Sequence, residues 1–366
     1  MDNIKWLNAL GIMSGASLDG AEFSLVKTDG IDVYAVYKSQ KFLYPEELKQ
    51  SIINAANNLN EENSKNADEQ FTDFIIKSFD DFISICDEKI DIIGFEGHTI
   101  CFEPDKHCIV QIGNAQQLAN HSKIKTVYHF HHNDIALGGQ GSPISTAYFA
   151  SLASGLERPL AFLNIGGTTM LIFIGDLGNA MAFDCGVGNN IINQFMHKHA
   201  CMDMDYDGKY AISGRVDEKV VQSLLKIKYL HKNPPKASSL NTIDDKIEHM
   251  EGLSIADGAA TATDFAAEAI CFQMRKFLPE MPKKVLICGG GAHNPTLKRF
   301  LRQKLPECVV ETADKSGFDM ATMEAQARGF LAARRLYNMP ISFPGVTGVI
   351  YPAIGGDLVY PDETSK

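Results

Sequence analysis

Three glycine-rich turns carry the residue types best suited to hold a nucleotide, since each directly follows an apolar run typical of a buried strand. They are residues 11–20 (GIMSGASLDG), 164–169 (NIGGTT) and 287–295 (ICGGGAHNP). Glycine permits positive φ and lets a phosphate approach the backbone closely. Unpaired N–H groups in such a turn form a nest that binds anions. Taken singly, each turn is also compatible with a plain hairpin.

The first turn also contains side chains that suit a metal-bound phosphate. Ser14 and Ser17 add hydroxyl donors, and Asp19 is a candidate Mg²⁺ ligand acting through water. Mg²⁺ keeps several of its waters and takes few carboxylates, so a single aspartate can serve.

The third turn differs from the two commonest nucleotide-binding motifs. Gly289, Gly290 and Gly291 lie between a predicted strand and a predicted helix, where a flat adenine could rest against them. No GK[ST] follows, as a Walker A loop requires, and the spacing is not the GxGxxG of a Rossmann turn. Both of those folds are therefore disfavoured.

Composition is ordinary for a soluble globular protein, with 45% hydrophobic and 22% charged residues. The 366 residues suffice for two domains of about 150 residues each. The net charge is -11 and no basic stripe is present, so we expect no nucleic-acid partner. No run of 18 apolar residues would span a membrane. The eight cysteines form no CxxC pair, which favours free thiols and a cytoplasmic location.

An internal repeat is the main architectural signal. The chain opens with a predicted antiparallel meander of three strands at residues 7–13, 21–27 and 31–37. The same order of strand, glycine turn and strand returns at residues 160–165, 170–174 and 180–184. The repeat predicts two related α/β domains, 1–158 and 159–366, with a cleft between them. The prediction leaves open that the last helix, residues 321–336, packs on the first domain instead of the second.

Further elements are expected from periodicity. Apolar residues recur at helical spacing at Phe71, Phe74, Ile75, Phe79, Phe82 and Cys86. Short buried strands are predicted at residues 90–95, 108–112 and 125–130. A glycine-rich break at 138–143 precedes a helix that runs to residue 154. The second half has a predicted helix at 255–278 and a strand at 285–288.

The chain resembles the anhydro-N-acetylmuramic acid kinases, as a divergent member. The motifs that carry the resemblance follow the family's order over nearly the whole chain: GIMSGASLDG, GHTICFEP, VQIGN, NDIALGGQGSPI, LNIGG, FDCGVGNN, CGGGAHNP and MEAQARGFLAARRL. The three glycine turns, in this order, are similar to the phosphate-1, phosphate-2 and adenosine motifs of the actin/hexokinase/Hsp70-type ATPases. The resemblance implies two ribonuclease-H-like domains.

The resemblance also implies an activity. The family hydrolyses the 1,6-anhydro bond of anhydro-N-acetylmuramic acid and phosphorylates O6 in one step, during recycling of cell-wall fragments. ATP and Mg²⁺ would be required, and the partners would be the sugar and ATP, with neither nucleic acid nor membrane. A homodimer is also suggested by the family.

Individual roles follow from the matched motifs. Asp184, the aspartate of FDCGVGNN, is the expected general base; the alternative is an Asx-turn or cap residue of the next helix. The expected nucleotide contacts are Gly15, Ala16, Ser17, Leu18, Asp19, Gly20, Ala21, Glu22, Gly166, Gly167, Gly289, Gly290, Gly291 and Glu324. The expected sugar contacts are His98, Thr99, His131 and Asn164. For Glu324, a solvated helix position is the alternative.

Several motifs depart from the family pattern, mostly on the sugar side. Ala16 replaces a threonine, and residues 96–99 read EGHT where the family has HGQT. His131 falls in the family's arginine-rich segment, and histidine lacks the guanidinium fork and is mostly neutral at pH 7. Cys185 and Val187 replace Thr and Pro. Two hypotheses follow: a kinase for a different (anhydro)sugar, or a catalytically weak ATP-binding sensor of the same fold.

A metal-dependent hydrolase is a third hypothesis. His129, His131, His132 and Asp134 are residue types that bind Zn²⁺. On a strand, His129 and His131 would share one face while His132 points away. Cys185 has no evident His partner in the sequence, so a small buried thiol is expected there rather than a nucleophile.

Overall fold

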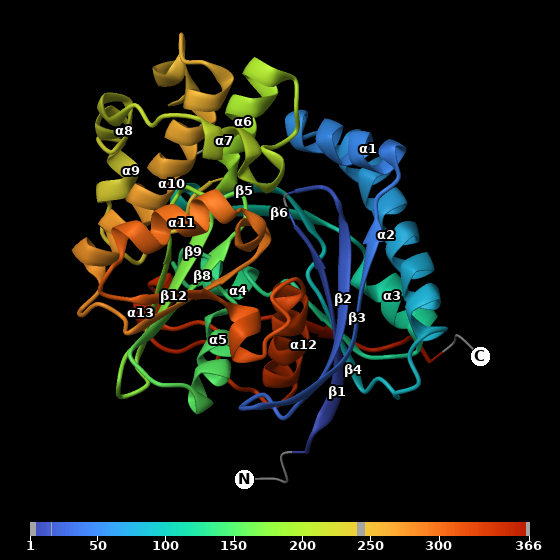
Figure 1. Cartoon of the computed structure of the whole chain (residues 1–366). Helices are drawn as coiled ribbons and strands as arrows, with labels where there is room; N and C mark the ends of the chain where they lie inside the picture. Colours follow the sequence, from blue (N-terminus) through green and yellow to red (C-terminus); the bar gives the residue numbers. More distant parts are fainter. Residues whose placement is uncertain (1–4, 16, 240–245, 364–366) are drawn as a thin grey trace. The chain divides into compact units, whose positions relative to one another are not determined.

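The structure, a computed structural model, describes residues 5–15, 17–239 and 246–363 (Figure 1). The chain divides into two compact units: unit 1 is Met1–Leu152 with Thr322–Lys366, and unit 2 is Ala153–Ala321. The segment after residue 321 therefore belongs to unit 1. The sequence pattern predicts it in the second domain and leaves open that its helix packs on the first domain. No helix in the described ranges is long and apolar enough to cross a membrane.

Unit 1 is built on a six-stranded sheet of order β13-β7-β4-β1-β2-β3. The strands β1, β2 and β3 form an antiparallel meander, β4 is parallel to β1, β7 is parallel to β4, and β13 is antiparallel to β7. Their bounds are Leu7–Ser14, Gly20–Thr28, Val33–Leu43, Ile92–Phe95, Thr126–Tyr128 and Asp357–Val359 for β1, β2, β3, β4, β7 and β13.

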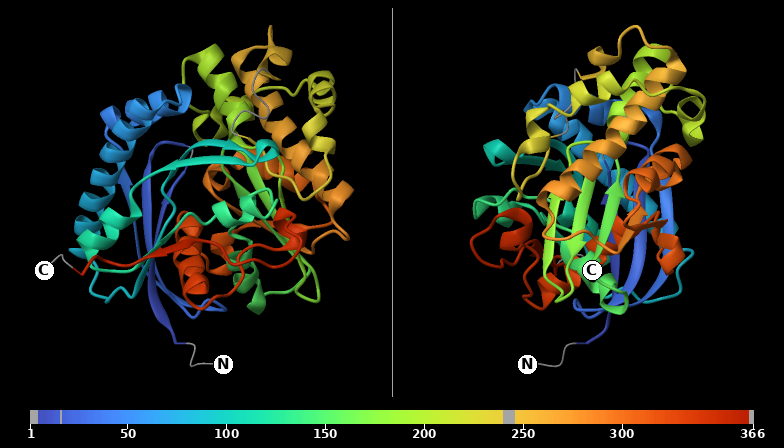
Figure 2. Two further views of the ribbon diagram at one scale, coloured as in Figure 1. Left: turned by 180° about the vertical axis from the view of Figure 1, so that it is seen from behind. Right: turned by 60° about the vertical axis from the view of Figure 1, so that its left-hand side comes forward.

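Helices cover both faces of this sheet (Figures 1 and 2). α1 (Glu46–Asn57), α2 (Glu61–Ile83) and α3 (Ala115–Ser122) bury their apolar faces in one core with β1, β2 and β4. α12 (Met323–Leu336) packs closely on the sheet, because Gly11 has no side chain: a Cβ there would lie 1.7 Å from the carbonyl oxygen of Ala325.

The remaining elements of unit 1 are short. β5 (His98–Glu103) and β6 (Cys108–Ile112) form a separate two-stranded sheet. The short helices are α4 (His132–Ala136), α5 (Thr146–Leu152), α13 (Pro344–Thr347) and the 3₁₀ turn η1 (Pro104–Lys106).

Unit 2 is built on a five-stranded sheet of order β10-β9-β8-β11-β12. Their bounds are Leu160–Ile165, Thr169–Ile174, Ala180–Asp184, Lys284–Cys288 and Val309–Thr312 for β8, β9, β10, β11 and β12. The helices are α6 (Asn189–Ala200), α7 (Lys209–Ser213), α8 (Glu218–Leu224), α9 (Lys228–His231), α10 (Ile255–Phe277) and α11 (Pro295–Lys304). The 3₁₀ turns are η2 (Ala153–Gly155), η3 (Tyr206–Gly208), η4 (Lys246–Met250), η5 (Gly290–His293) and η6 (Ala313–Ser316).

The five strands of unit 2 repeat the order of β3-β2-β1-β4-β7 in unit 1: three antiparallel strands are followed by two parallel ones added beside the first, and unit 1 adds β13 at its edge. This is the ribonuclease-H-like order, and two such units in one chain define the actin/hexokinase/Hsp70 type of fold. The predicted fold class and the predicted repeat are confirmed.

Two predicted strand boundaries are wrong for local reasons, and a third strand has its predicted bounds but is less buried than expected. The third strand starts at Val33 rather than at residue 31, because the Asp29 carboxylate accepts the N–H groups of Ile31 and Asp32 and forms a turn. The strand predicted at 125–130 ends at Tyr128, since His129 adopts φ 54°. The strand at 108–112 is found, but it lies in the small sheet and is mostly half-buried.

Candidate active site

In unit 2, the predicted catalytic and glycine residues lie along one edge of the sheet. β8, β10 and β11 are parallel to one another, so their carboxyl ends meet there. In register, Asn164 is opposite both Cys288 and Met170, and Met170 is opposite Asp184. The fold thus brings Asn164 and Asp184 to one sheet edge, together with the glycine turns that begin at residues 166 and 289.

The Asp184 carboxylate is buried and held by three donors. Its Oδ1 accepts the Gly186 N–H at 2.6 Å, and its Oδ2 accepts the hydroxyls of Ser238 at 2.6 Å and Thr168 at 2.9 Å. Burial raises the pKa of Asp184, and the three hydrogen bonds oppose that rise without cancelling it. The carboxylate is therefore held in one orientation, and it takes up a proton at a higher pH than an exposed aspartate does.

Asp184 does not cap α6. The residue at the N-cap position is Gly188, and no side chain caps the helix. The first N–H groups of α6, from Asn189 and Asn190, donate to the carbonyls of Gly166 and Gly167. The bond from the Gly186 N–H to Oδ1 is of the Asx-turn kind, so the carboxylate orients its own loop as well as facing Ser238 and Thr168.

The third glycine turn exposes backbone. Gly289 has φ 72°, and a Cβ there would lie 2.4 Å from Asn164 Oδ1, so a side chain would be both strained and obstructed. Gly290 is exposed, and Gly291 packs on Ile165. The Asn294 side chain accepts the N–H groups of Thr296 and Leu297 and caps α11.

In unit 1, the first glycine turn connects β1 to β2 and carries a compact set of charges. Ala16 lies outside the described residues. Asp19 accepts a hydrogen bond from Ser17 Oγ at 2.7 Å and pairs with Lys41 Nζ at 2.6 Å. Lys41 Nζ also lies 3.4 Å from a carboxylate oxygen of Glu22, while Leu18 adopts φ 54°.

The two carboxylates of this loop differ. Burial alone would raise the pKa of Asp19, but hydrogen bonds from Lys41 and Ser17 lower it, so Asp19 is an anion. Burial raises the pKa of Glu22, and Lys41 only partly offsets that. Lys41 was not singled out by the sequence, since nothing local links it to the loop 22 residues earlier.

A buried ionic network follows β4 in unit 1. Glu96 accepts hydrogen bonds from the Arg328 guanidinium on α12 and, at 2.6 Å, from Nε2 of His131. Arg328 also donates to Ser145 Oγ and lies 3.3 Å from Glu324, which accepts a hydrogen bond from Ser145 at 2.7 Å. Glu324 is therefore part of this network rather than a solvated helix position.

The charges of the network stabilise one another. Burial alone would raise the pKa of Glu96, but Arg328 and His131 lower it to about 2. Burial alone would lower the pKa of His131, but Glu96 raises it above the ordinary value. His131 Nδ1 lies 2.5 Å from the Gly141 carbonyl oxygen, so both ring nitrogens are bound to protein groups.

His98 and Thr99 lie at the start of β5. His98 is buried, its Nδ1 lies 2.6 Å from Ser14 Oγ, and burial lowers its pKa to about 4, so the ring is neutral. Ser14 Oγ in turn lies 2.5 Å from the Tyr44 hydroxyl. Thr99 Oγ1 accepts a hydrogen bond from Gln111, which also donates to Glu96. Through Ser14, the end of β1 is hydrogen-bonded to His98, one of the predicted sugar contacts.

The histidine segment does not form a metal centre. Within the described residues, no three His, Cys, Asp or Glu side chains are placed to hold a metal ion. The predicted strand geometry is wrong: His129 follows the end of β7 and pairs with Asp357 at 3.0 Å, while His131 precedes α4. Asp134 accepts the Gly141 N–H and the Thr347 hydroxyl.

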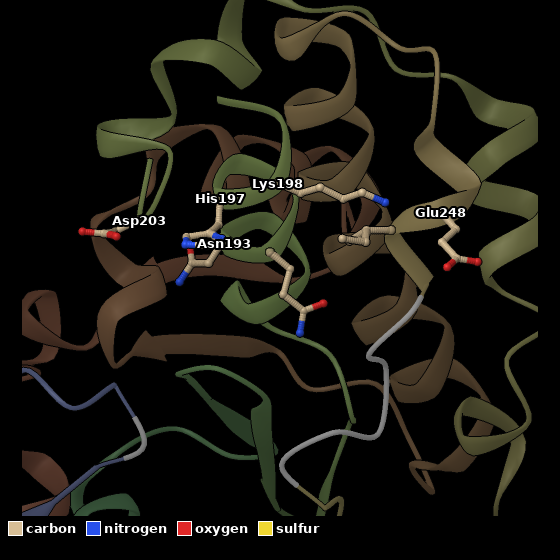
Figure 3. Close-up of a pocket in the computed structure, with 7 residues that line it drawn as sticks. Asn193, His197, Lys198, Asp203 and Glu248 are labelled. Carbon is tan, nitrogen blue, oxygen red and sulfur yellow. The ribbon is translucent and has the colours of Figure 1, made fainter. Parts of the chain in front are cut away.

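A hollow with a volume of about 560 Å³ lies on unit 2 beside α6. Figure 3 shows residues that line it. It is lined by Asn193, Gln194, His197, Lys198, Asp203, Ile247 and Glu248. None of the predicted site residues is among them, so the hollow is separate from the Asp184 edge.

Comparison with known proteins identifies the family of this chain. The family model described as anhydro-N-acetylmuramic acid kinase matches residues 7–361. The chain belongs to the anhydro-N-acetylmuramic acid kinase family. Two members of that family are the proteins of that name from Acidiphilium cryptum, 34% identical over 98% of this chain and 100% of that protein, and from Rhodopseudomonas palustris strain HaA2, 37% identical over 97% and 100%. Among solved structures, component A of (R)-2-hydroxyglutaryl-CoA dehydratase from Acidaminococcus fermentans aligns over 90% of this chain and 99% of that chain, with 11% identity and a TM-score of 0.47.

The donors around Asp184 were the main residues that the motifs did not assign. Thr168 lies within the second glycine turn, and Ser238 lies in the segment 234–239, shortly after two prolines. Two hydroxyl residues beside glycine and proline turns were the only available signal, and such residues are common in turns for other reasons. Their link to Asp184 in this anhydro-N-acetylmuramic acid kinase family member depends on tertiary contacts.

Proposed function

We propose that this chain is an ATP-dependent kinase that opens the 1,6-anhydro bond of anhydro-N-acetylmuramic acid and phosphorylates O6, giving N-acetylmuramic acid 6-phosphate. Membership of a kinase family supports the reaction class. The observation that carries the proposal is the Asp184 carboxylate, buried at a sheet edge and oriented by Gly186, Ser238 and Thr168.

Asp184 acts as the general base. A carboxylate offers about four acceptor sites, and three donors among the described residues leave capacity for a water. Asp184 takes a proton from that water while the water oxygen bonds to the anomeric carbon and the bond from that carbon to O6 breaks. O6 then attacks the γ-phosphorus of ATP, and ADP leaves.

The glycine turns fit a nucleotide. Strained or crowded positions such as Gly289 exclude side chains, and Gly290 leaves its backbone exposed. We assign the phosphates to the loop 15–22 and to Gly166 and Gly167, and the adenosine to residues 289–291. Asp19 is anionic and about half exposed, which suits a Mg²⁺ ligand acting through water. Mg²⁺ would neutralise charge that develops on the transferred phosphoryl group.

The direct test is a coupled assay with purified protein, ATP, Mg²⁺ and anhydro-N-acetylmuramic acid, comparing the native protein with Asp184→Asn. We expect ADP and sugar phosphate in equal amounts from the native protein, and a rate about 10²–10⁴-fold lower from the variant. ATP affinity, measured by calorimetry, should be unchanged. Full activity in Asp184→Asn would refute the assigned base.

A second candidate function is a kinase for an anhydro sugar without a carboxylate side chain. It is favoured by His131, which stands in the family's arginine-rich segment and has both ring nitrogens bound to Glu96 and Gly141. Such a residue offers a sugar carboxylate no free donor. A screen of 1,6-anhydro sugars with and without the lactyl group separates the two. No ADP with any sugar, while ATP still raises the melting temperature, would instead support an ATP-binding sensor.

A cytoplasmic location and a homodimer stay predictions of the family resemblance. Size-exclusion chromatography with light scattering tests the dimer: a mass near 80 kDa supports it, since the chain is 40.2 kDa.

A further inference from the structure

A lysine is completely buried beneath the Asp184 loop. Lys236 has no exposed surface. Its Nζ donates to Gln273 Oε1 at 2.6 Å and to the Tyr229 carbonyl at 3.1 Å. Three rings surround it, with centroids 4.8 Å (Tyr229), 4.9 Å (Phe277) and 5.5 Å (Phe183) from Nζ. Aromatic faces attract a desolvated cation, so the cage is built for an ammonium.

Burying an ammonium costs desolvation free energy that packing by itself does not require. Among the described residues, Nζ donates to an amide and a carbonyl rather than to a carboxylate. An apolar side chain of the same length would fill this space without the desolvation cost. The charge therefore needs an explanation beyond stability.

The groups that hold Lys236 are the groups that hold Asp184. The Asp184 N–H donates to the Lys236 carbonyl at 3.0 Å, and the Tyr229 hydroxyl donates to the Asp184 carbonyl at 2.9 Å. Gln273, which accepts from Nζ, donates to the carbonyl of Cys185 at 2.9 Å. Two residues after Lys236, Ser238 donates to the carboxylate itself. These hydrogen bonds connect the strand end that carries the proposed base to the segment 229–238 and to α10.

We propose that Lys236 is a positioning residue for Asp184: its ammonium fastens the segment 229–238 to α10 and, through its positive charge, favours the ionised carboxylate. The inference rests on the proposed role of Asp184 as base. The charged or titratable groups that act on Lys236 are Asp184, Cys185, Lys232 and Lys276. Burial is the largest influence and lowers the pKa of Lys236 to about 8, so the side chain remains an ammonium at pH 7; Cys185 and Asp184 oppose that fall, and the two lysines add to it.

The test compares kcat/KM for the anhydro sugar against pH in Lys236→Met, which removes the charge, and Lys236→Arg, which keeps it. Removing the cation should raise the pKa of the base, so the acidic limb of the profile should move up by about one pH unit in Lys236→Met. The rate at pH 7 should fall about 10–100-fold there. Lys236→Arg should keep the native acidic limb, even if its rate falls.

Lys283→Met is the matched control, because Lys283 is an exposed lysine of unit 2 whose side chain pairs with Glu157 on the surface. It should leave rate and profile unchanged. A native acidic limb in Lys236→Met, or the same shift in Lys236→Arg, would overturn the proposal, since a merely structural residue would alter the rate without a charge-dependent shift.

Two further variants keep the outcomes distinct. If Lys236→Met does not fold, Gln273→Glu keeps an acceptor for Nζ and adds a compensating negative charge. The acidic limb should again move up, and an unmoved limb would overturn the proposal. Asp184→Asn separates the two hypotheses. If Asp184→Asn is active, Asp184 is not the base and the proposed mechanism is refuted. If Asp184→Asn is inactive while Lys236→Met has the native pH profile, only the proposed role of Lys236 is refuted.

Discussion

Glu96, directly after β4 in unit 1, and Asp184, the last residue of β10 in unit 2, are both buried carboxylates, yet their pKa values move in opposite directions. Glu96 faces the cations Arg328 and His131, which lower its pKa to about 2. Within the described residues the donors to Asp184 are the neutral groups of Gly186, Ser238 and Thr168, and burial prevails and raises its pKa. The charge of the neighbours, rather than burial, decides which carboxylate is a fixed anion and which can accept a proton.

The largest effect should come from removing the fixed anion. Glu96→Gln leaves Arg328 and His131 buried without their partner, and breaking a buried pair costs about 3–5 kcal/mol. Urea denaturation followed by circular dichroism measures that loss in the free energy of unfolding. Asp184→Asn should lose much less, since the donors that the structure describes around Asp184 are neutral. Equal losses in both variants would contradict the comparison.

The pH dependence of stability should differ in sign between the two variants. The folded pKa of Glu96 is lowered, so its stabilisation is full above its ordinary value of 4.5 and is lost as pH falls toward about 2. The folded pKa of Asp184 is raised, so its ionised form disfavours folding above that pKa and the penalty disappears on acidification.

Urea midpoints of the native protein and both variants between pH 3 and 7 test this difference. The difference in urea midpoint between the native protein and Glu96→Gln should become smaller as the pH falls below 4.5. The urea midpoint of the native protein relative to that of Asp184→Asn should instead rise on acidification, because protonation removes the penalty for burying the Asp184 charge. Parallel curves for the two variants would show that the neighbours do not set the shifts.

A moderate effect is expected from a single neutral donor. Ser238→Ala removes a 2.6 Å hydrogen bond that lowers the pKa of Asp184. The acidic limb of kcat/KM should therefore rise by about half a pH unit, with a rate loss of roughly 3–10-fold, as expected for a bond of about 1 kcal/mol. Ser213→Ala, which removes a hydroxyl on α7 bonded to its own helix, is the control. An unshifted limb would mean that Ser238 does not act on the base.

The smallest effect on stability should follow Asp19→Asn. The Asp19–Lys41 pair is about half exposed, and exposed pairs contribute only about 0–1 kcal/mol. If Asp19 acts as the Mg²⁺ ligand, the apparent affinity for ATP should depend more steeply on Mg²⁺ concentration in the variant. Titration of ATP binding at several Mg²⁺ concentrations measures this. Unchanged Mg²⁺ dependence would leave Asp19 as a surface ion pair only.

Local patterns in the chain predicted much of this architecture. Alternating apolar strands with glycine turns between them appear twice, and both meanders form as expected, because strand period and turn chemistry act over a few residues. The boundaries failed where a single side chain intervened, as at Asp29, or where one residue took positive φ, as at His129.

By itself, the sequence determined the family, the duplicated fold and the position of Asp184 at a strand end. Only the tertiary structure decided the surroundings of each carboxylate. Arg328 is 232 residues from Glu96, and Ser238 is 54 residues from Asp184. A pKa depends on charge and solvent within a few ångströms, and no local pattern records which distant side chains the fold brings that close.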